Sequence, residues 1–305
     1  MNDPAQVKDG SIFFTDGYVV SKEVVLVAAK LNAIADQYFS RLYCLTHGRW
    51  LRADVKDSVH SATFDSDAGQ GLWLGLDGSV IETLPSSGRS DFKIPDTRRY
   101  GNLNRVKCIS GDFYICGYGG QVYKRKDNAW NHHDVGLLIP KPDAMSVDLL
   151  DIDGNGPDDL YAVGTGGAMW HFDGAQWRAL SSPTNVHLTG VRCVSSTEVY
   201  ICGFRGVLMK GNQDGWNVLS PGSILSNFYD VEFFREELYV SAMKGIWTLK
   251  GASLEPMEVL PDNEPKLTFH RLHSNGEVLW SFGTDHLAYF DGTDWHYVRH
   301  PDNLE

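Results

Sequence analysis

The sequence repeats itself with a period of about 40 residues. The clearest copy is "DLYAVGTGGAMWHFDGAQW" at 159–177, and the stretches at 112–130, 198–216 and 277–295 follow the same plan. Each copy passes from an apolar stretch through small residues into a second apolar stretch, and then through a polar turn to a tryptophan. A repeat of this length that contains several short β-like segments is the signature of a β-propeller blade.

The position of that tryptophan measures the repeat along the whole chain. Seven positions fit, spaced 38 to 47 residues apart: Trp50, Phe92, Trp130, Trp177, Trp216, Glu255 and Trp295. The sequence therefore predicts an all-β chain folded as a seven-bladed β-propeller. The widest interval contains residues 139–159, "IPKPDAMSVDLLDIDGNGPDD", and predicts an insertion there.

Four strands can be placed within a copy. In the one that ends near Trp216 they are "LTGVRCVS" nearest the axis, then "EVYICGF", "GVLMKG" and the outer "GWNVLS". Small residues recur at one register of the second strand, where they predict a close approach of neighbouring backbones. These residues are Gly117, Gly164, Gly203 and Gly283, with Ala242 substituting in one copy.

The first copy is irregular. Residues 21–40 mix a β-rich "VVLV" with an Ala-rich stretch, and short apolar runs of this kind fit a strand or a helix equally well. Six blades plus an N-terminal cap is therefore the alternative to seven blades.

Composition favours one folded domain. A single propeller over residues 1–303 accounts for 42% hydrophobic residues and 31 glycines, and the final "LE", 304–305, resembles a cloning scar. The start lacks the features of a secretory signal, and "VVLVAA" is too short to span a bilayer, so we expect a cytoplasmic protein that does not bind membranes. Five cysteines without a CxxC spacing predict buried free thiols in a reducing compartment.

The formal net charge of −12, without a basic stripe, argues against nucleic acid as a partner because phosphate neutralisation dominates that binding. An acidic surface instead favours basic proteins and cations. The alternative is that the charge only maintains solubility.

The most specific short motif is "DIDGNGPDD", residues 151–159. Asp151, Asp153, Asn155 and Asp159 stand at spacings that can wrap oxygen ligands around Ca²⁺, with Gly156 allowing a sharp turn. The motif resembles the calcium loops of EF-hands and of integrin-type propeller repeats. The alternative is an ordinary polar turn between strands.

Signatures of catalysis are absent from the sequence. It contains no GxSxG, HExxH or P-loop motif, and the adjacent His132 and His133 fall on opposite faces of a strand. We therefore predict a protein that is not an enzyme and has no catalytic residues.

The copies at 112–130, 159–177 and 198–216 resemble the bacterial YVTN/BNR-like propeller repeats, related in pattern to photosynthetic assembly-factor propellers. The resemblance covers most of the chain from about residue 41. It implies a β-propeller, and it also extends to immunity proteins encoded beside bacterial toxins.

Three functions fit these observations. The first is a monomeric immunity protein that binds and neutralises a cognate, basic toxin; the alternatives are a glycan- or small-ligand-binding lectin, whose exposed Trp and Tyr would stack on sugars, and an assembly chaperone. A closed ring leaves few strand edges free, so loops should bind the partner. The longest connect an outer strand to the next inner one, at 86–102, 139–159 and 261–268.

Overall fold

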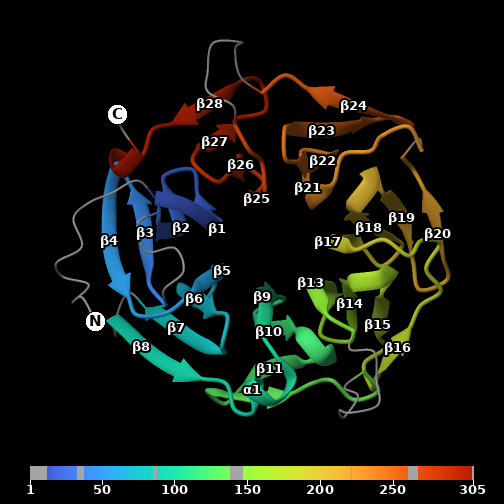
Figure 1. Ribbon diagram of the computed structural model, residues 1–305, viewed down its shortest axis with the longest axis horizontal. Helices are drawn as coiled ribbons and strands as arrows, with labels where there is room; N and C mark the ends of the chain where they lie inside the picture. Colours follow the sequence, from blue (N-terminus) through green and yellow to red (C-terminus); the bar gives the residue numbers. More distant parts are fainter. Residues whose placement is uncertain are drawn as a thin grey trace.

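Seven four-stranded antiparallel sheets stand around a central axis in the computed structural model (Figure 1). The structure describes residues 12–32, 38–84, 88–137, 147–220, 222–259 and 267–303. Each sheet consists of four strands that follow one another in the chain, so each sheet is one sequence repeat. The prediction of a seven-bladed β-propeller is confirmed.

The strands run outward from the axis in chain order within each blade. The first three blades are β1 (Ile12–Ser21), β2 (Val24–Leu31), β3 (Ser40–Thr46) and β4 (Arg49–Val55); β5 (Val59–Asp65), β6 (Gln70–Gly75), β7 (Ser79–Leu84) and β8 (Gly88–Lys93); and β9 (Leu103–Ile109), β10 (Asp112–Gly117), β11 (Val122–Lys126) and β12 (Ala129–His132). The fourth and fifth are β13 (Leu149–Gly156), β14 (Asp159–Gly164), β15 (Met169–Phe172) and β16 (Trp177–Ala179); and β17 (Leu188–Ser195), β18 (Glu198–Gly203), β19 (Leu208–Asn212) and β20 (Gly215–Val218). The last two are β21 (Phe228–Phe234), β22 (Glu237–Ala242), β23 (Gly245–Lys250) and β24 (Ser253–Met257); and β25 (Arg271–Ser274), β26 (Leu279–Phe282), β27 (Leu287–Phe290) and β28 (Trp295–Val298). Short helical turns are α1 (Thr97–Tyr100), η3 (Tyr118–Gly120), η4 (Thr165–Gly167), η5 (Phe204–Gly206) and η6 (Pro301–Asn303).

The irregular first repeat is a complete blade. β1 pairs with β2 along nearly its whole length, and β2 carries the "VVLVAA" stretch between two partner strands. The alternative of six blades plus a cap is therefore wrong.

Two predicted positions are out of register in the weak repeats. The pairing of β23 with β24 sets Leu254, not Glu255, opposite Leu249, which is the place that Trp295 takes opposite Phe290. In the second blade the equivalent residue is Arg89, three residues before Phe92. Leu254 is buried whereas Glu255 is exposed, so the apolar contact between blades selects the register.

Two segments predicted as loops are strands in part. Gly88–Lys93, within the predicted loop 86–102, forms the outer strand β8, and Leu149–Gly156, within the predicted insertion 139–159, forms the inner strand β13. Residues 86–87, 139–146 and 261–266 of the predicted binding loops, and 304–305, lie outside the described residues.

Seven buried apolar clusters fill the junctions between neighbouring blades in the described part of the chain. The repeated tryptophan belongs to these clusters: Trp177, for example, packs on Tyr114 and Cys116 of the preceding blade and donates a hydrogen bond from Nε1 to His133 O at 2.7 Å. Because each blade buries its faces against two neighbours, no blade has a core of its own. The recurring tryptophan is thus explained by packing between blades.

The first and last blades close the ring side by side, without exchanging a strand (Figure 1). Phe14 N donates to Thr284 O at 2.7 Å, and Val19 N donates to His273 Nδ1 at 3.2 Å. The last helical turn adds Asp302, which accepts hydrogen bonds from Arg41 Nη1 at 3.1 Å and Tyr43 Oη at 2.5 Å.

The two faces of the ring differ in character. The upper face carries the connections that lead into the inner strands and those between second and third strands; the lower face carries the remaining hairpin turns. The described turns of the lower face contain ten acidic residues but only two Lys or Arg residues, Lys22 and Arg235. The ten are Glu23, Asp67, Asp127, Asp158, Asp173, Asp214, Glu236, Glu277, Asp291 and Asp294.

Candidate functional site

A β-bulge recurs near the start of the inner strands. Pairing with the second strand skips one inner-strand residue in six of the blades. The skipped residues are Thr15, His60, Asn104, Leu150, Thr189 and Tyr229. A bulge takes one residue out of the ladder and redirects its side chain, and bulges gather at barrel rims and binding sites.

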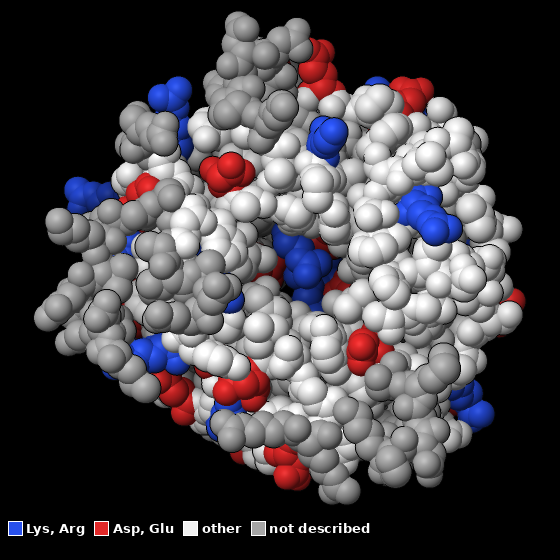
Figure 2. Space-filling model, in the orientation of Figure 1, with Lys and Arg blue, Asp and Glu red and all other residues white. Residues whose placement is uncertain are grey.

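All six skipped residues line one cavity of about 440 Å³ at the centre of the upper face, which we call the channel mouth. The seventh blade contributes His270 and Arg271, and the remaining lining residues are Phe14, Phe204 and Thr284. Figure 2 shows this face as largely uncharged around a central hollow with Lys or Arg side chains inside it. Every blade thus supplies a residue to one site.

A layer of ion pairs closes the channel below the mouth. Arg105 of β9 reaches three carboxylates from three other blades: its Nε lies 3.1 Å from Asp151 Oδ1, its Nη1 lies 3.3 Å from Asp16 Oδ1, and its Nη2 lies 3.4 Å from Asp230 Oδ2. Burial opposes the charge on Arg105, but the three carboxylates outweigh it and raise the pKa of this guanidinium. The layer therefore holds a permanent cation beneath the mouth.

The same carboxylates join neighbouring inner strands. Asp16 accepts a hydrogen bond from Ala62 N at 2.9 Å, Asp151 from Val191 N at 3.0 Å, and Asp230 from Leu272 N at 3.1 Å. Each of these aspartates therefore links its own blade to the next one and to the central arginine.

A second layer lies two residues further along the inner strands. Lys107 Nζ lies 3.5 Å from Asp151 Oδ2 and 3.9 Å from Asp153 Oδ1, and Arg192 Nε lies 2.9 Å from Glu232 Oε1. Burial opposes the charge on Lys107, yet the aspartates outweigh it and raise its pKa. This layer is a second network of ion pairs among the inner strands.

The structure separates the four predicted calcium ligands into two pairs. Asp151 and Asp153 belong to the channel network, where Lys107 lies beside both carboxylates. Asn155 and Asp159 lie at the lower end of the hairpin, where Asn155 Nδ2 donates to Asp159 Oδ2 at 2.8 Å and His171 pairs with Asp159 Oδ1 at 2.8 Å. Among the described residues no group of three or more His, Cys, Asp or Glu side chains is arranged to hold a metal.

As placed, these residues do not offer four oxygen ligands to one ion. Calcium binding stays a prediction, which calorimetry on the wild type and Asp153→Ala tests. A calcium-dependent heat in the wild type that the variant lacks would support the predicted site.

The cysteines and tryptophans are buried or half-buried. Cys116 and Cys202 are buried, the other three cysteines are half-buried, and no disulfide joins any of the five. None of the nine tryptophans is exposed. The lectin interpretation expected exposed tryptophans and tyrosines for stacking on sugars; the tryptophans give it no support, whereas Tyr38 and Tyr118 are exposed.

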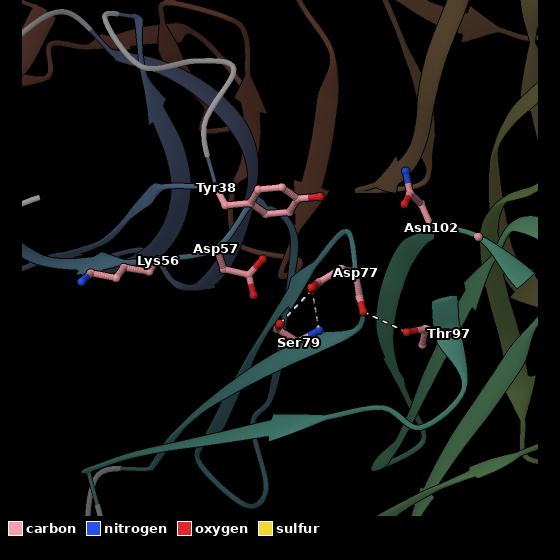
Figure 3. A pocket seen from close by; sticks show the side chains of 8 residues that line it. Tyr38, Lys56, Asp57, Asp77, Ser79, Thr97 and Asn102 are labelled. Atoms are coloured by element: carbon pink, nitrogen blue, oxygen red, sulfur yellow. Dashed lines mark hydrogen bonds between the residues drawn. The ribbon is translucent and has the colours of Figure 1, made fainter. Parts of the chain in front are cut away.

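A second cavity of about 600 Å³ lies on the upper face between the first two blades (Figure 3). Tyr38, which is exposed, lies beside Asp57 on one side, and Asp77 lies opposite. Asp77 is already engaged, since it accepts hydrogen bonds from Ser79 and pairs with Lys93 at 2.6 Å. The channel mouth is the stronger candidate because all seven blades converge on it.

No family model matches the chain. Over 292 residues, however, it is 31% identical to the immune protein Tsi7 of Pseudomonas aeruginosa, a match that covers 92% of this chain and 94% of that protein. This chain belongs to the Tsi7 family. The resemblance to immunity proteins predicted from the repeats therefore agrees with a relative of nearly equal length, while membership of the YVTN/BNR-like family stays a prediction.

Solved structures extend the comparison to the fold of this Tsi7-family protein. The WD40 β-propeller domain of Doa1 matches with a TM-score of 0.70 at 12% identity, covering 95% of this chain and 94% of that one. The structure of YCF48 bound to D1 peptide matches with a TM-score of 0.69 at 14% identity, covering 93% and 95%. At such identities the likeness shows a shared propeller fold alone.

Proposed function

We propose that this protein is an immunity protein that binds and neutralises a cognate bacterial toxin. The observation that carries the proposal is its 31% identity to an immune protein across nearly the full length of both chains. The ring supports it, because rigid blades hold many loops on one face at fixed positions. In this proposal the protein acts by binding rather than by catalysis.

The upper face is the docking surface in this proposal. Five of the seven large hydrophobic residues that are exposed in the described chain lie in its connections: Tyr38, Tyr118, Val135, Leu225 and Met243. The core of a protein interface is depleted of charge and enriched in aromatic residues and methionine. The largely uncharged upper face fits that pattern better than the acidic lower face.

The toxin is a basic protein in this proposal, and the immunity protein acts as a cytoplasmic monomer that binds neither nucleic acid nor membranes. The net charge of −12 would speed the encounter with such a partner. In the part of the chain that the structure describes, no helix is long and apolar enough to cross a bilayer.

Co-expression with the product of the neighbouring gene tests the proposal. The wild type should restore growth to cells that make the toxin, and the two proteins should purify as a complex. Leu225→Arg on the upper face should weaken both effects, whereas Val218→Arg on the outer strand β20, also exposed, should leave them unchanged. A toxin that stays active beside the wild type, with no complex formed, would contradict the function.

A further inference from the structure

The channel mouth presents cations to solvent and keeps its acids behind them. The side chain of Arg271 is 22% exposed and that of Arg105 is 8% exposed, whereas those of Asp16, Asp151 and Asp230 are 0 to 4% exposed. Figure 2 shows Lys or Arg side chains in the central hollow, with Asp or Glu side chains beside them. A group that enters the mouth therefore meets guanidinium groups first, although the chain as a whole is acidic.

Arg271 has hydrogen-bond donors to spare. Its nearest ion-pair contact is Nε to Asp16 Oδ1 at 4.0 Å, and its guanidinium makes no hydrogen bond to any other described residue. A guanidinium carries five N–H donors in a planar fork that fits a carboxylate with two parallel bonds. The exposed fork in the mouth thus fits a carboxylate better than it fits any group it now contacts.

The other residues that line the mouth are uncharged. Burial lowers the pKa of His60 to about 4 and also lowers that of His270, so neither ring adds a charge near neutral pH. His60 Nε2 is buried and has no hydrogen-bond partner among the described residues. On the rim, the Phe204 and Tyr229 rings lie 6.4 Å apart and the Tyr229 and His270 rings lie 5.1 Å apart, which gives an apolar wall.

We infer that the channel mouth binds an acidic side chain, Asp or Glu, on a protruding loop of the toxin. The carboxylate accepts hydrogen bonds from Arg271, and the loop around it packs on Phe204 and Tyr229. A cavity of about 440 Å³ holds one such side chain with its neighbours. This inference rests on the proposed function and specifies the anchor by which the upper face holds its partner.

A first experiment tests the mouth without the toxin. Sodium acetate, a carboxylate probe, is titrated into the protein while NMR follows the ring protons of His60 and His270. The wild type should show saturable shifts at millimolar acetate, and Arg271→Gln should abolish them. The matched control Arg205→Gln, on the same face in η5, should leave these shifts unchanged. Shifts that do not saturate in the wild type would overturn the inference, whatever the toxin does.

A second experiment measures the complex with the product of the neighbouring gene. Arg271→Gln should raise Kd by about 30-fold or more, mainly through faster dissociation, because the toxin carboxylate is left buried without its partner. Arg205→Gln should change Kd by less than about threefold. Melting temperatures of both variants should match the wild type, since the contact of Arg271 with Asp16 is long.

An alanine scan of the acidic residues of the toxin completes the test. One alanine variant of the toxin should bind the wild-type immunity protein more weakly than the unmutated toxin does. The same variant and the unmutated toxin should bind Arg271→Gln with equal affinity. Arg271→Gln could bind the toxin as tightly as the wild type does, while wild-type protein binds acetate in the channel mouth. The site then binds small anions only, and the inference is wrong although the immunity function stands. If the wild type binds acetate but no toxin, the proposed function fails instead.

Discussion

Single residues decide how closely the parts of a blade can approach. The second strand of a blade contacts the connection that leads into the same blade at one position, which is glycine in four blades: Gly117, Gly164, Gly203 and Gly283. A Cβ on Gly117 would lie 2.5 Å from Asn102 O in that connection. At Gly164 the backbone is extended, with φ of −169°, so any residue could adopt it. The need for glycine at this register is therefore steric, as the repeat predicts.

Gly164→Ala should lower the free energy of unfolding by about 1 to 3 kcal/mol, because its Cβ would overlap the carbonyl group of Asp148. Gly215→Ala in β20 is the control, since nothing lies within 4 Å of its Cβ. Urea denaturation of both variants measures the difference. Equal loss in the two would show that the backbone, not the contact, matters.

His286 makes stability depend on pH. It is buried, and neither ring nitrogen has a hydrogen-bond partner among the described residues. Burial lowers its pKa to about 4 from an ordinary value near 6.5. The folded state therefore stays neutral while the unfolded chain gains a proton, so stability should fall as pH decreases from about 6.5 to about 4.

His286→Gln should remove part of this loss. Gln121 occupies the equivalent place in the third blade and is fully buried there, with Nε2 donating to Tyr118 O at 2.7 Å. The wild type should lose up to about 3 kcal/mol relative to the variant between pH 7 and pH 4. Chemical denaturation at the two pH values measures this; parallel curves would contradict the assignment.

At the scale of elements, each blade is completed by its neighbours. Pairing in the first and last sheets uses only their own strands, so closure depends on side chains, on the turn η6 and on the backbone hydrogen bond from Phe14 N to Thr284 O. His300 lies against the rings of Phe14, Tyr43 and Trp50, with centroids 4.4 to 5.6 Å away. Burial lowers the pKa of His300 to about 4, which keeps this aromatic contact uncharged.

Asp302→Ala should destabilise the ring by about 3 kcal/mol, because it leaves the buried Arg41 without one of its carboxylates and Tyr43 without its acceptor. Asp91→Ala is the control: Asp91 pairs with Arg89, but both side chains are more than 40% exposed, so the loss should stay below about 0.5 kcal/mol. Thermal unfolding of the two variants decides. A ring that tolerates Asp302→Ala as well as Asp91→Ala would show that η6 plays no part in closure.

At the scale of the molecule, the proposed function assigns approach and docking of the toxin to different faces of the ring. Acids concentrate in the turns of the lower face, while the upper face holds the mouth and most exposed apolar side chains. Long-range attraction acts through the sum of charges, whereas dissociation depends on the contacts that must break. A toxin could therefore be attracted by one face and held by the other.

The triple variant Asp67→Asn, Asp127→Asn, Asp214→Asn tests this separation. All three carboxylates are exposed in lower-face turns. Binding kinetics at low salt should show association about two- to fivefold slower with dissociation unchanged, and the difference should shrink as salt screens charges beyond about 8 Å. Faster dissociation would place the interface on the lower face.

The sequence by itself determined the propeller fold and the order of strands within a blade, whereas the choice of seven blades over six plus a cap needed the structure. Copies of one unit that cannot bury its faces alone must stack, and "LTGVRCVS" was predicted as the inner strand that β17 forms. Strong copies fixed the register because Trp177 and its equivalents fill a blade junction. Weak copies did not, since Leu254 and Glu255 are adjacent and only the pairing of β24 shows that Leu254 takes the tryptophan position.

Only the tertiary structure decided the site. Thr15, His60 and Tyr229 are three different residue types that lie far apart in sequence, yet equivalent bulges in separate blades bring them to one cavity. The sequence predicts Asp151 and Asp153 as calcium ligands because only their spacing, which is local information, is visible in it. Their ion-pair partners in the structure, Arg105 and Lys107 of another blade, come from closure of the ring, which brings charges from distant repeats together at one axis.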